Sequence, residues 1–379
     1  MHTQSNFRLL VVRLGAMGDI LHALPAVTAL RIAHPGWIID WVVEPRWRAL
    51  LSAVDDRSNG FNGAAPHPPH EGVAGGPAAE GQRNPAQPLV DRIYLAPTKD
   101  WGRSPFSAQT VRGIRGLRAA LKAAQYNAVL DFQGAVRSAA IGRMAGTHRL
   151  IGEARPREFG ARWLFTERVN AEGAHVIEQD MVLGAAVAGD DLAPAEPWLP
   201  VDPIAEAWAC EVLRRSSGQP AALITPGAGW GAKRWPVERY AAVAAGLIER
   251  GFKVLANAGP GEEPLADLIA ERTGGLAVPL SCTLNQLISL TRRIQLAVAG
   301  DTGPLHLACA LGCPVIGIYG PTDPSRNGPF GTRFRVLRSL ASRRDHTRRA
   351  FPEAGMLTIA PEDVLRAADE LAAEEAYHG

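Results

Sequence analysis

Two acidic residues of this chain stand beside glycines at points where an apolar run gives way to a helix-like segment. Asp19 follows Gly15 and Gly18 in the sequence RLGAMGDI, and Asp301 follows Gly300 in the sequence AGDTGPLH. Glycine lets a backbone approach a ligand closely, and the N–H groups at a helix start favour phosphate. The pattern therefore indicates phosphate binding.

The segment 296–324 carries the richer of the two patterns. Leu296–Ala299 predicts a buried strand, and small and capping residues then predict the start of a helix. Such a turn favours a diphosphate. Asp301, the hydroxyl of Thr302 and the imidazole of His306 together point to a sugar nucleotide. One alternative stays open here, in which Asp301 only caps the helix and His306 is a core histidine with its hydrogen bonds satisfied.

The first of the two patterns lies near the N-terminus. Phe7–Arg13 predicts an apolar strand and Ile20–Ala33 a helix. The glycines between them do not have the G-x-G-x-x-G spacing, so we do not expect NAD binding. Asp19 falls in the first helical turn at the carboxyl end of a strand. It could equally be an N-terminal helix acid that the helix dipole stabilises.

Two further strand ends carry residues suited to a nucleotide. The loop Thr225–Gly229 is glycine-rich around Gly227, and Lys233 follows it. A lysine there can neutralise a diphosphate that gains charge as a sugar leaves, although a surface lysine is the alternative. Glu262 and Glu263 follow the next strand. One of these carboxylates could bind ribose hydroxyls, and an acid at a helix N-terminus is equally compatible.

Strand-like runs alternate with helix-like runs along the whole chain of 379 residues, which predicts parallel sheets with helices on both faces. The length suits two domains. The predicted strands are Phe7–Arg13, Trp37–Val43, Arg92–Leu95, Asn127–Phe132, Ala221–Thr225, Phe252–Asn257, Ile294–Ala299 and Val315–Tyr319. The Pro-rich segment Leu192–Pro203 should link the domains, with the ligand bound between them at the carboxyl ends of both sheets.

We expect a first α/β domain over residues 1–195 and a second over residues 204–355. The C-terminal segment 356–379 should form a helix that packs back on the first domain. Residues 55–88 are rich in Gly, Pro, Ala and His and lack apolar periodicity, which predicts a disordered insertion. His67 and His70 lie in this insertion, but lone histidines in such tracts are usually inert, so no metal site is expected.

Composition narrows the class of protein. The net charge of +2 excludes a protein that binds polyanions such as nucleic acid through its bulk charge, and 46% hydrophobic residues suffice for buried cores. The four cysteines lack the spacing of disulfide or zinc sites. No run approaches the length of a transmembrane span, and the first apolar run is only strand-sized. We therefore expect a cytoplasmic protein, which could sit on a membrane surface.

Positive charge is concentrated in one part of the first half. Residues 99–168 contain 13 Lys and Arg against five Asp and Glu. Such a block indicates an acidic partner or an anionic surface, with a solvated basic face as the alternative. Arg112, Arg115 and Arg118 recur every third residue on a predicted helix and so share roughly one face.

With these residues in view, the chain resembles the lipopolysaccharide heptosyltransferases, and most of all the type I enzyme. The segments that carry the resemblance span nearly the whole chain outside 55–88: RLGAMGDILHALPAVTALR, IDWVVEPRW, KDWGRSPFS, LDFQGAVRSAAIGR, PGAGWGAKRWP, AGPGEEPLA and AGDTGPLHLACALGCPVIGIYGPTDP. The resemblance implies the GT-B fold, two doubly wound Rossmann-like domains facing across a cleft. It also implies an inverting transfer of heptose from ADP-heptose to Kdo of the lipopolysaccharide inner core, on Kdo-lipid A.

The resemblance assigns roles to particular residues. Asp19 matches the general base and Lys233 the donor-phosphate lysine, so both are catalytic candidates. The implied donor-binding residues are Thr225, Gly227, Lys233, Glu262, Asp301, Thr302, Gly303 and His306. The implied acceptor-binding residues are Gly18, Lys99, Arg103 and Arg137. Ala16 stands where the family often has Ser or Thr, so one hydroxyl contact is absent.

The implied chemistry agrees with the residues. One carboxylate can take the proton of the attacking sugar hydroxyl, and ADP is a good leaving group once its charge is neutralised. Neither a cofactor nor a metal is expected. The enzyme should work as a peripheral protein on the cytoplasmic face of the inner membrane, with its anionic surface as a partner. The alternatives are a related transferase that adds a later heptose or another sugar, and a non-catalytic sugar-nucleotide-binding protein of the same fold.

Overall fold

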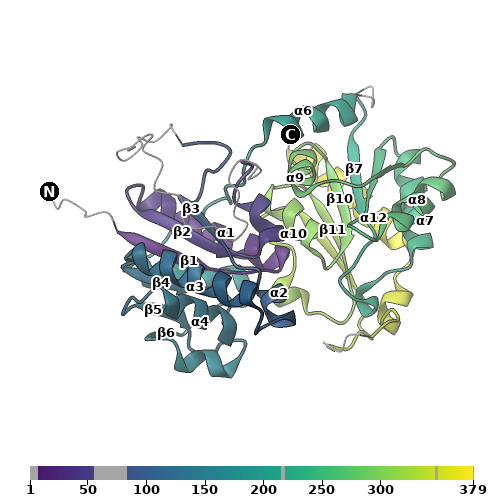
Figure 1. Ribbon diagram of the computed structural model, residues 1–379. Coiled ribbons are helices and arrows are strands. Elements are labelled where there is room, and N and C mark those ends of the chain that lie inside the picture. The colour runs from purple at the N-terminus through teal and green to yellow at the C-terminus, as the bar shows by residue number, and fades with distance from the viewer. Residues whose placement is uncertain (1–6, 55–82, 215–217, 346–348, 379) are drawn as a thin grey trace. The chain divides into compact units, whose positions relative to one another are not determined.

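The computed structural model describes residues 7–54, 83–214, 218–345 and 349–378, without side chains from residue 375 onward. The chain divides into two compact units, Met1–Val201 and Asp202–Gly379. Each unit contains one six-stranded parallel sheet covered by helices (Figure 1). The boundary between the units falls within the Pro-rich segment Leu192–Pro203.

The sheet of the first unit has the strand order β3-β2-β1-β4-β5-β6. Its strands are β1 (Arg8–Val12), β2 (Ile38–Val43), β3 (Arg92–Leu95), β4 (Ala128–Asp131), β5 (Leu150–Glu153) and β6 (Glu167–Val169). The chain first moves outward from β1 to β3 and then returns to place β4 on the other side of β1. The strand order therefore reverses between β1 and β4, which is where doubly wound sheets bind ligands.

The reversal explains why helices cover both faces of the first sheet, because right-handed crossovers in opposite directions lie on opposite faces of a sheet. The helices are α1 (Met17–Ala33), α2 (Thr98–Arg103), α3 (Ala108–Ala123), α4 (Val136–Met144) and α5 (Val176–Ala188), with the short 3-10 turns η1 (Pro45–Leu50) and η3 (Phe159–Trp163). Side chains of α3 and α4 share one core with Leu10 and Val12 of β1. Helix α1 packs against α5.

The second unit repeats the arrangement, with the strand order β12-β11-β10-β7-β8-β9. Its strands are β7 (Ala221–Thr225), β8 (Lys253–Asn257), β9 (Val278–Leu280), β10 (Leu296–Gly300), β11 (Val315–Tyr319) and β12 (Phe334–Arg338). Its helices and 3-10 turns are α6 (Pro203–Arg214), η4 (Gly231–Lys233), α7 (Val237–Glu249), α8 (Glu263–Arg272), α9 (Leu284–Thr291), α10 (Gly303–Ala310), α11 (Pro324–Asn327), η5 (Ala354–Thr358) and α12 (Pro361–His378). Here the order reverses between β7 and β10.

The C-terminal helix corrects one expectation. Helix α12, which was expected to pack on the first unit, packs on α7 and β12 of the second. Its buried side chains join the core of the second unit, and they are Val364, Ala367, Ala368 and Leu371. Arg250 binds the carboxylate of Asp369 at 2.7 and 2.9 Å. An apolar stripe on a helix shows that the helix is buried against something, but it does not show against what.

The expected insertion 55–88 also needs a correction at its end. Residues 55–82, with His67 and His70, lie outside the described residues. Residues 83–88 are held in place, since the N–H of Ala53 donates to the carbonyl of Ala86 at 2.7 Å. The N–H of Val201 donates to the carbonyl of Pro85 at 2.9 Å. Because backbone hydrogen bonds hold residues 83–88 in place, the low apolar content of this stretch did not indicate that it is ordered.

Candidate functional site

Two clusters of polar side chains lie at the two points where strand order reverses, one in each unit. In the second unit, β7 ends at Thr225, which is buried and pairs in register with Ala299 of β10. Strand β10 ends at Gly300, so Asp301 leaves the sheet directly beside the end of β7. The expected donor residues Thr225 and Asp301 are thus brought to one edge of one sheet.

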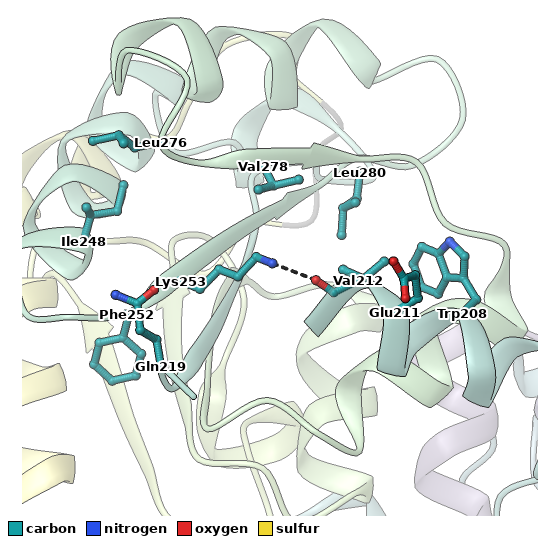
Figure 2. Close-up of a pocket in the computed structure, with 10 residues that line it drawn as sticks. All are labelled: Trp208, Glu211, Val212, Gln219, Ile248, Phe252, Lys253, Leu276, Val278 and Leu280. Atoms are coloured by element: carbon teal, nitrogen blue, oxygen red, sulfur yellow. Dashed lines mark hydrogen bonds between the residues drawn. The ribbon is translucent and has the colours of Figure 1, made fainter. Parts of the chain in front are cut away.

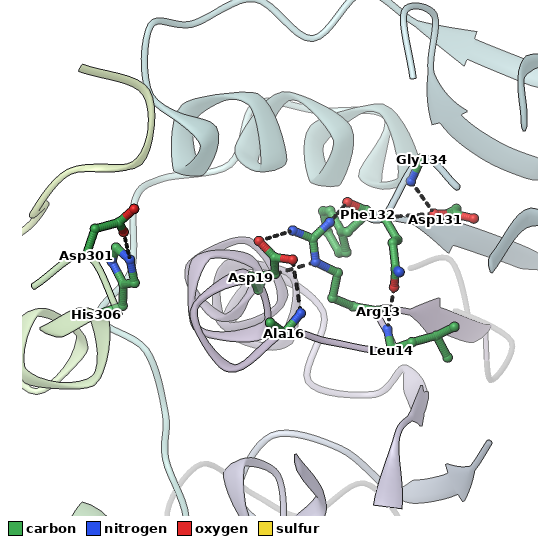
Figure 3. A network of polar contacts seen from close by, with 10 residues as sticks. Arg13, Leu14, Ala16, Asp19, Asp131, Phe132, Gly134, Asp301 and His306 are labelled. Carbon is green, nitrogen blue, oxygen red and sulfur yellow. Dashed lines mark hydrogen bonds and ion pairs between the residues drawn. The ribbon is translucent and has the colours of Figure 1, made fainter. Parts of the chain in front are cut away.

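Lys233, Asp301 and His306 form the centre of the second-unit cluster. The ammonium of Lys233 forms an ion pair with Asp301 Oδ2 and donates to the Asp301 carbonyl at 3.3 Å. His306 Nε2 lies 3.2 Å from Asp301 Oδ1, as Figure 3 shows. The side chains of Lys233 and Asp301 are only 12% and 7% exposed. Lys233 is therefore no solvated surface lysine, and the Asp301 carboxylate binds two side chains instead of capping α10.

The electrostatics of this cluster keep Asp301 ionised. Burial alone would raise the pKa of Asp301, but the hydrogen bond with His306 and the charge of Lys233 outweigh it and hold the pKa well below its usual value. The Lys233 ammonium also lies 4.4 Å from the centre of the Trp230 ring. The carboxylate and the indole ring fix the position of a cation, and a cation fixed at a strand end can neutralise a bound diphosphate.

The start of α10 adds further polar groups to this edge. Thr302 is the residue before the helix, its side chain makes no capping bond, and its hydroxyl donates to the Gly300 carbonyl at 3.2 Å. Gly303 is the first residue of the helix. The helix N-terminus is thus directed at the same edge as Thr225 and the Lys233 cluster, and its dipole favours an anion there.

The structure distinguishes between the two candidate ribose carboxylates. A Cβ atom at Gly227 would lie 1.9 Å from Glu262 Oε2, so only glycine permits the approach of these two residues. Arg234 binds Glu262 Oε1 at 3.2 Å. Glu263 instead accepts a hydrogen bond from the N–H of Gly261 at 3.0 Å and stabilises its own turn. Glu262 therefore lies beside the glycine-rich loop 225–229. The hydrogen bond of Glu263 within its own turn accounts for the position of that carboxylate without a ligand.

In the first unit, Asp19 lies in the first turn of α1, just after β1. The N–H of Ala16 donates to Asp19 Oδ2 at 3.0 Å, and Arg13 Nη2 lies 3.3 Å from Asp19 Oδ1. Asp19 is 36% exposed, whereas Arg13 is 7% exposed. The buried Arg13 cation thus orients the Asp19 carboxylate, which remains accessible to a ligand (Figure 3).

Arg13 is a functional candidate that the sequence motifs did not identify. Its Nε donates to the Asp19 carbonyl at 3.1 Å and its Nη1 to the carbonyl of Phe132. It thereby connects the end of β1 with the residue that follows β4, across the reversal of strand order. The only signal in the sequence was a charged residue at the end of an otherwise apolar strand.

Buried carboxyl groups surround this arginine. Asp131 accepts hydrogen bonds from the N–H groups of Gln133 and Gly134 at 2.7 and 2.9 Å, and burial raises its pKa to about 6. Burial likewise raises the pKa of Asp180, on α5, to about 7, and Arg13 partly offsets this. These acids support the site without reaching solvent.

The expected acceptor residues follow the carboxyl ends of three strands of the same sheet. Gly18 precedes Asp19 in α1, Lys99 and Arg103 lie in α2 after β3, and Arg137 lies in the first turn of α4 after β4. The last three are exposed. Arg103 binds Asp100 of its own helix at 3.1 Å. The topology therefore places all four at one edge of the first sheet.

A separate hollow of about 670 Å³ lies in the second unit, away from these residues. Figure 2 shows Trp208 and Val212 of α6 on one side of it, with Lys253 of β8 donating to the Val212 carbonyl at 2.7 Å. None of the expected site residues lines it. The carboxylate that lines it, Glu211, is paired with Arg214. This hollow is not the candidate site.

Comparisons with known proteins agree with this geometry. The model of glycosyltransferase family 9 (heptosyltransferase) matches residues 114–353. The chain is 29% identical over 352 residues to lipopolysaccharide heptosyltransferase 1 of Escherichia coli K12, covering 88% of this chain and 93% of that one. It is 30% identical to lipooligosaccharide heptosyltransferase 2 of Haemophilus influenzae, but over only 53% of this chain and 61% of that one.

Solved structures give the same result. The structure of Escherichia coli heptosyltransferase WaaC with ADP superimposes with a TM-score of 0.73 at 26% identity, covering 96% of this chain and all of that one. WaaC with ADP-2-deoxy-2-fluoro heptose gives 0.70 at 25% identity, covering 96% of this chain and 99% of that one. Because the family model covers more than half of the chain, this protein belongs to glycosyltransferase family 9, the heptosyltransferase family, and is a glycosyltransferase with an α/β fold of the GT-B type.

Proposed function

We propose that this enzyme transfers heptose from ADP-heptose to Kdo of the lipopolysaccharide inner core, on Kdo-lipid A, with inversion at the anomeric carbon. The observation that carries the proposal is the Lys233–Asp301–His306 cluster at the strand-order reversal of the second sheet. It lies in a chain that resembles WaaC, whose structures hold ADP and an ADP-heptose analogue. The 88% coverage of this chain by heptosyltransferase 1, against 53% by heptosyltransferase 2, supports the first position of transfer.

On the donor side, Lys233 and the start of α10 bind the diphosphate. Asp301 holds the ammonium in place, and Glu262 beside Gly227 accepts hydrogen bonds from ribose hydroxyls. Negative charge on the diphosphate grows as the bond from the anomeric carbon to its oxygen breaks. The Lys233 ammonium therefore binds the transition state more strongly than the intact donor, which is the condition for catalysis.

On the acceptor side, Asp19 takes the proton of the attacking Kdo hydroxyl. The hydroxyl oxygen forms its bond to the anomeric carbon on the face opposite ADP, and the electron pair of the broken bond leaves with the β-phosphate. Lys99, Arg103 and Arg137 attract the acidic acceptor. A single carboxylate suffices, because the leaving diphosphate needs no proton, unlike the leaving sugar of a glycoside hydrolase.

We further propose that the enzyme works as a peripheral protein at the cytoplasmic face of the inner membrane, where a lipid-linked acceptor lies. Among the residues that the structure describes, no helix is long and apolar enough to cross a membrane. Arg112, Arg115 and Arg118 are all exposed on α3. Near an anionic membrane each such residue can contribute about 1 kcal/mol of binding free energy.

The test is ADP release measured with ADP-heptose and a panel of acceptors. We expect turnover with Kdo-lipid A and little turnover with an acceptor that already carries the first heptose. The opposite preference would identify a transferase that adds a later heptose. No release with any acceptor, together with intact ADP-heptose binding, would identify a non-catalytic sugar-nucleotide-binding protein, a class that has no use for a positioned base such as Asp19.

A further inference from the structure

Three large aromatic side chains of the first unit are exposed to solvent. Phe106 is 95% exposed, Phe159 is 65% exposed and Trp163 is 71% exposed. Phe159 and Trp163 both lie in η3, and we call these two residues the aromatic patch. Exposing a single aromatic ring is common, but two exposed rings in contact with each other, as Phe159 and Trp163 are, mark a surface that is covered in use.

Topology places the aromatic patch at the carboxyl edge of the first sheet. Helix α3 returns from the end of β3 to the start of β4, so its N-terminus and the preceding Phe106 lie at that edge. Helix α4 starts at the end of β4, and η3, which carries Phe159 and Trp163, packs against α4. Helices α3 and α4 also contact each other on the same face of the sheet.

The pair in η3 is held in a defined geometry. The rings of Phe159 and Trp163 lie edge to face, with centroids 6.2 Å apart and planes at 84°. Glu158 Oε2 accepts a hydrogen bond from the N–H of Val136 at 2.8 Å, which fixes η3 to the first turn of α4. Val136 is itself 43% exposed and extends the apolar surface. The two rings are therefore presented outward by anchored backbone.

Positive charge borders the aromatic patch. Arg155 and Arg157 are exposed just before η3, and Arg137 is exposed beside Val136. The one acidic residue between Arg155 and Trp163 is Glu158, whose carboxylate binds the backbone of α4. Outward-facing Trp and Phe with a basic border match the interface of an anionic bilayer, where rings enter the headgroup region and arginines meet phosphates.

We propose that the aromatic patch inserts into the headgroup region of an anionic lipid bilayer, with Arg155 and Arg157 bound to lipid phosphates. This inference deepens the proposed function, since it would bring the edge of the sheet that holds Asp19 down to a lipid-linked acceptor. It differs from the basic stripe on α3, because its binding is apolar as well as electrostatic. It should therefore survive added salt better than binding through Arg112, Arg115 and Arg118 alone.

The experiment measures partitioning of the full chain onto vesicles of phosphatidylglycerol and phosphatidylcholine. The double variant Phe159→Ser with Trp163→Ser should bind about tenfold or more weakly than the wild type. The control is Ile204→Ser, which removes a side chain that is 83% exposed but stands between the acidic residues Asp202 and Glu206. It should bind the vesicles like the wild type. Arg155→Gln with Arg157→Gln should bind the mixed vesicles more weakly than the wild type and should change little on phosphatidylcholine alone.

Wild-type vesicle binding by the double variant would overturn the proposal. So would a wild-type dimer that the double variant loses without any change in vesicle binding, because the occupant would then be a second copy of the chain. All variants alter exposed side chains, so equal melting temperatures are expected and exclude misfolding. Transfer to a soluble, delipidated acceptor should remain normal in the double variant. If the wild type does not transfer heptose to this soluble acceptor, the proposed function is contradicted, whereas the result with vesicles still stands.

Discussion

At the scale of single residues, the second-unit site depends on one buried ion pair between residues 68 positions apart, Lys233 and Asp301. Removing one partner of such a pair leaves the other charge uncompensated, which costs more than the pair itself contributes. In this site the uncompensated charge would be the Asp301 carboxylate, which would keep its contact with His306.

Lys233→Ala should therefore slow transfer more than it weakens binding of the intact donor. Loss of a charge donor that acts on the leaving diphosphate costs about 3 kcal/mol of transition-state stabilisation. Steady-state rates and ADP-heptose affinity by calorimetry give the two quantities. Lys122→Ala, which changes an exposed lysine of α3, is the control and should be neutral. A defect confined to the Michaelis constant would contradict the role of Lys233.

Asp19→Asn should keep the fold and the donor affinity and lose about 10²–10⁴-fold in turnover, because the amide cannot take the proton of the acceptor hydroxyl. Asn can still accept the hydrogen bond from the N–H of Ala16. The matched control is Asp191→Asn, an exposed acid of the same unit. Turnover of Asp19→Asn within a few fold of the control would remove Asp19 from the mechanism.

Arg13 should act through Asp19, as a positioning residue. Arg13→Met should lower kcat with little change in KM for the acceptor, and Arg13→Lys should restore part of kcat because it restores the charge. The double variant with Asp19→Asn should be no slower than Asp19→Asn alone, since the two residues act as one unit. Additive losses in this cycle would show that Arg13 supports the fold and not the carboxylate.

At the scale of elements, helix α5 carries an ionisable group into the protein interior. Burial raises the pKa of Asp180 to about 7, while in the unfolded chain this carboxyl should titrate near the ordinary aspartate value of 3.8. Between these two values the folded state binds more protons than the unfolded state. The free energy of unfolding therefore falls as pH rises through this window, and Asp131, with a pKa of about 6, contributes in the same direction.

Asp180→Asn should raise the free energy of unfolding at about pH 8 by an amount on the order of a few kcal/mol, and by much less near pH 5. Denaturant titrations at the two pH values measure this difference. The exposed control Asp191→Asn should show no such pH dependence. A stabilisation that is the same at both pH values would show that folding does not raise the pKa of Asp180.

At the scale of the whole molecule, the expected donor residues and the proposed base belong to different units. Thr225, Glu262 and the Lys233 cluster all lie in the unit Asp202–Gly379, whose core is closed by its own C-terminal helix. Asp19 and Arg13 lie in the unit Met1–Val201. Each unit has a complete sheet and a core of its own, as an independently folding domain requires.

A fragment of residues 202–379 should therefore fold and bind ADP but catalyse no transfer. Its melting should be cooperative, and calorimetry should show ADP affinity within about tenfold of that of the full chain, because every expected donor residue is retained. The matched fragment of residues 202–355 lacks α12 and should be unstable. Equal stability of the two fragments would show that α12 contributes little to the core.

The general architecture and the positions of the candidate site residues along the chain were predictable from the sequence. The strands of both sheet centres were predictable, because parallel strands buried on both faces are continuous apolar runs, as in LLVV of β1 and LAVAG of β10. The short strands β5, β6, β9 and β12 were not. Strand β5 is buried but only four residues long, and β6, β9 and β12 contain exposed or half-buried residues, such as Arg335 and Arg338 in β12. These strands exist because neighbouring strands supply their hydrogen bonds.

The glycines and acids at the strand ends were also visible in the sequence, because a tight turn and a helix start impose local requirements on residue type. Only the tertiary structure decided which groups meet. It paired Lys233 with Asp301, brought Glu262 and not Glu263 beside Gly227, joined Arg13 to the carbonyl of Phe132 and packed α12 on the second unit. Each of these contacts joins segments far apart in the chain, and residue type and spacing along the sequence carry no record of which distant segment a side chain will face.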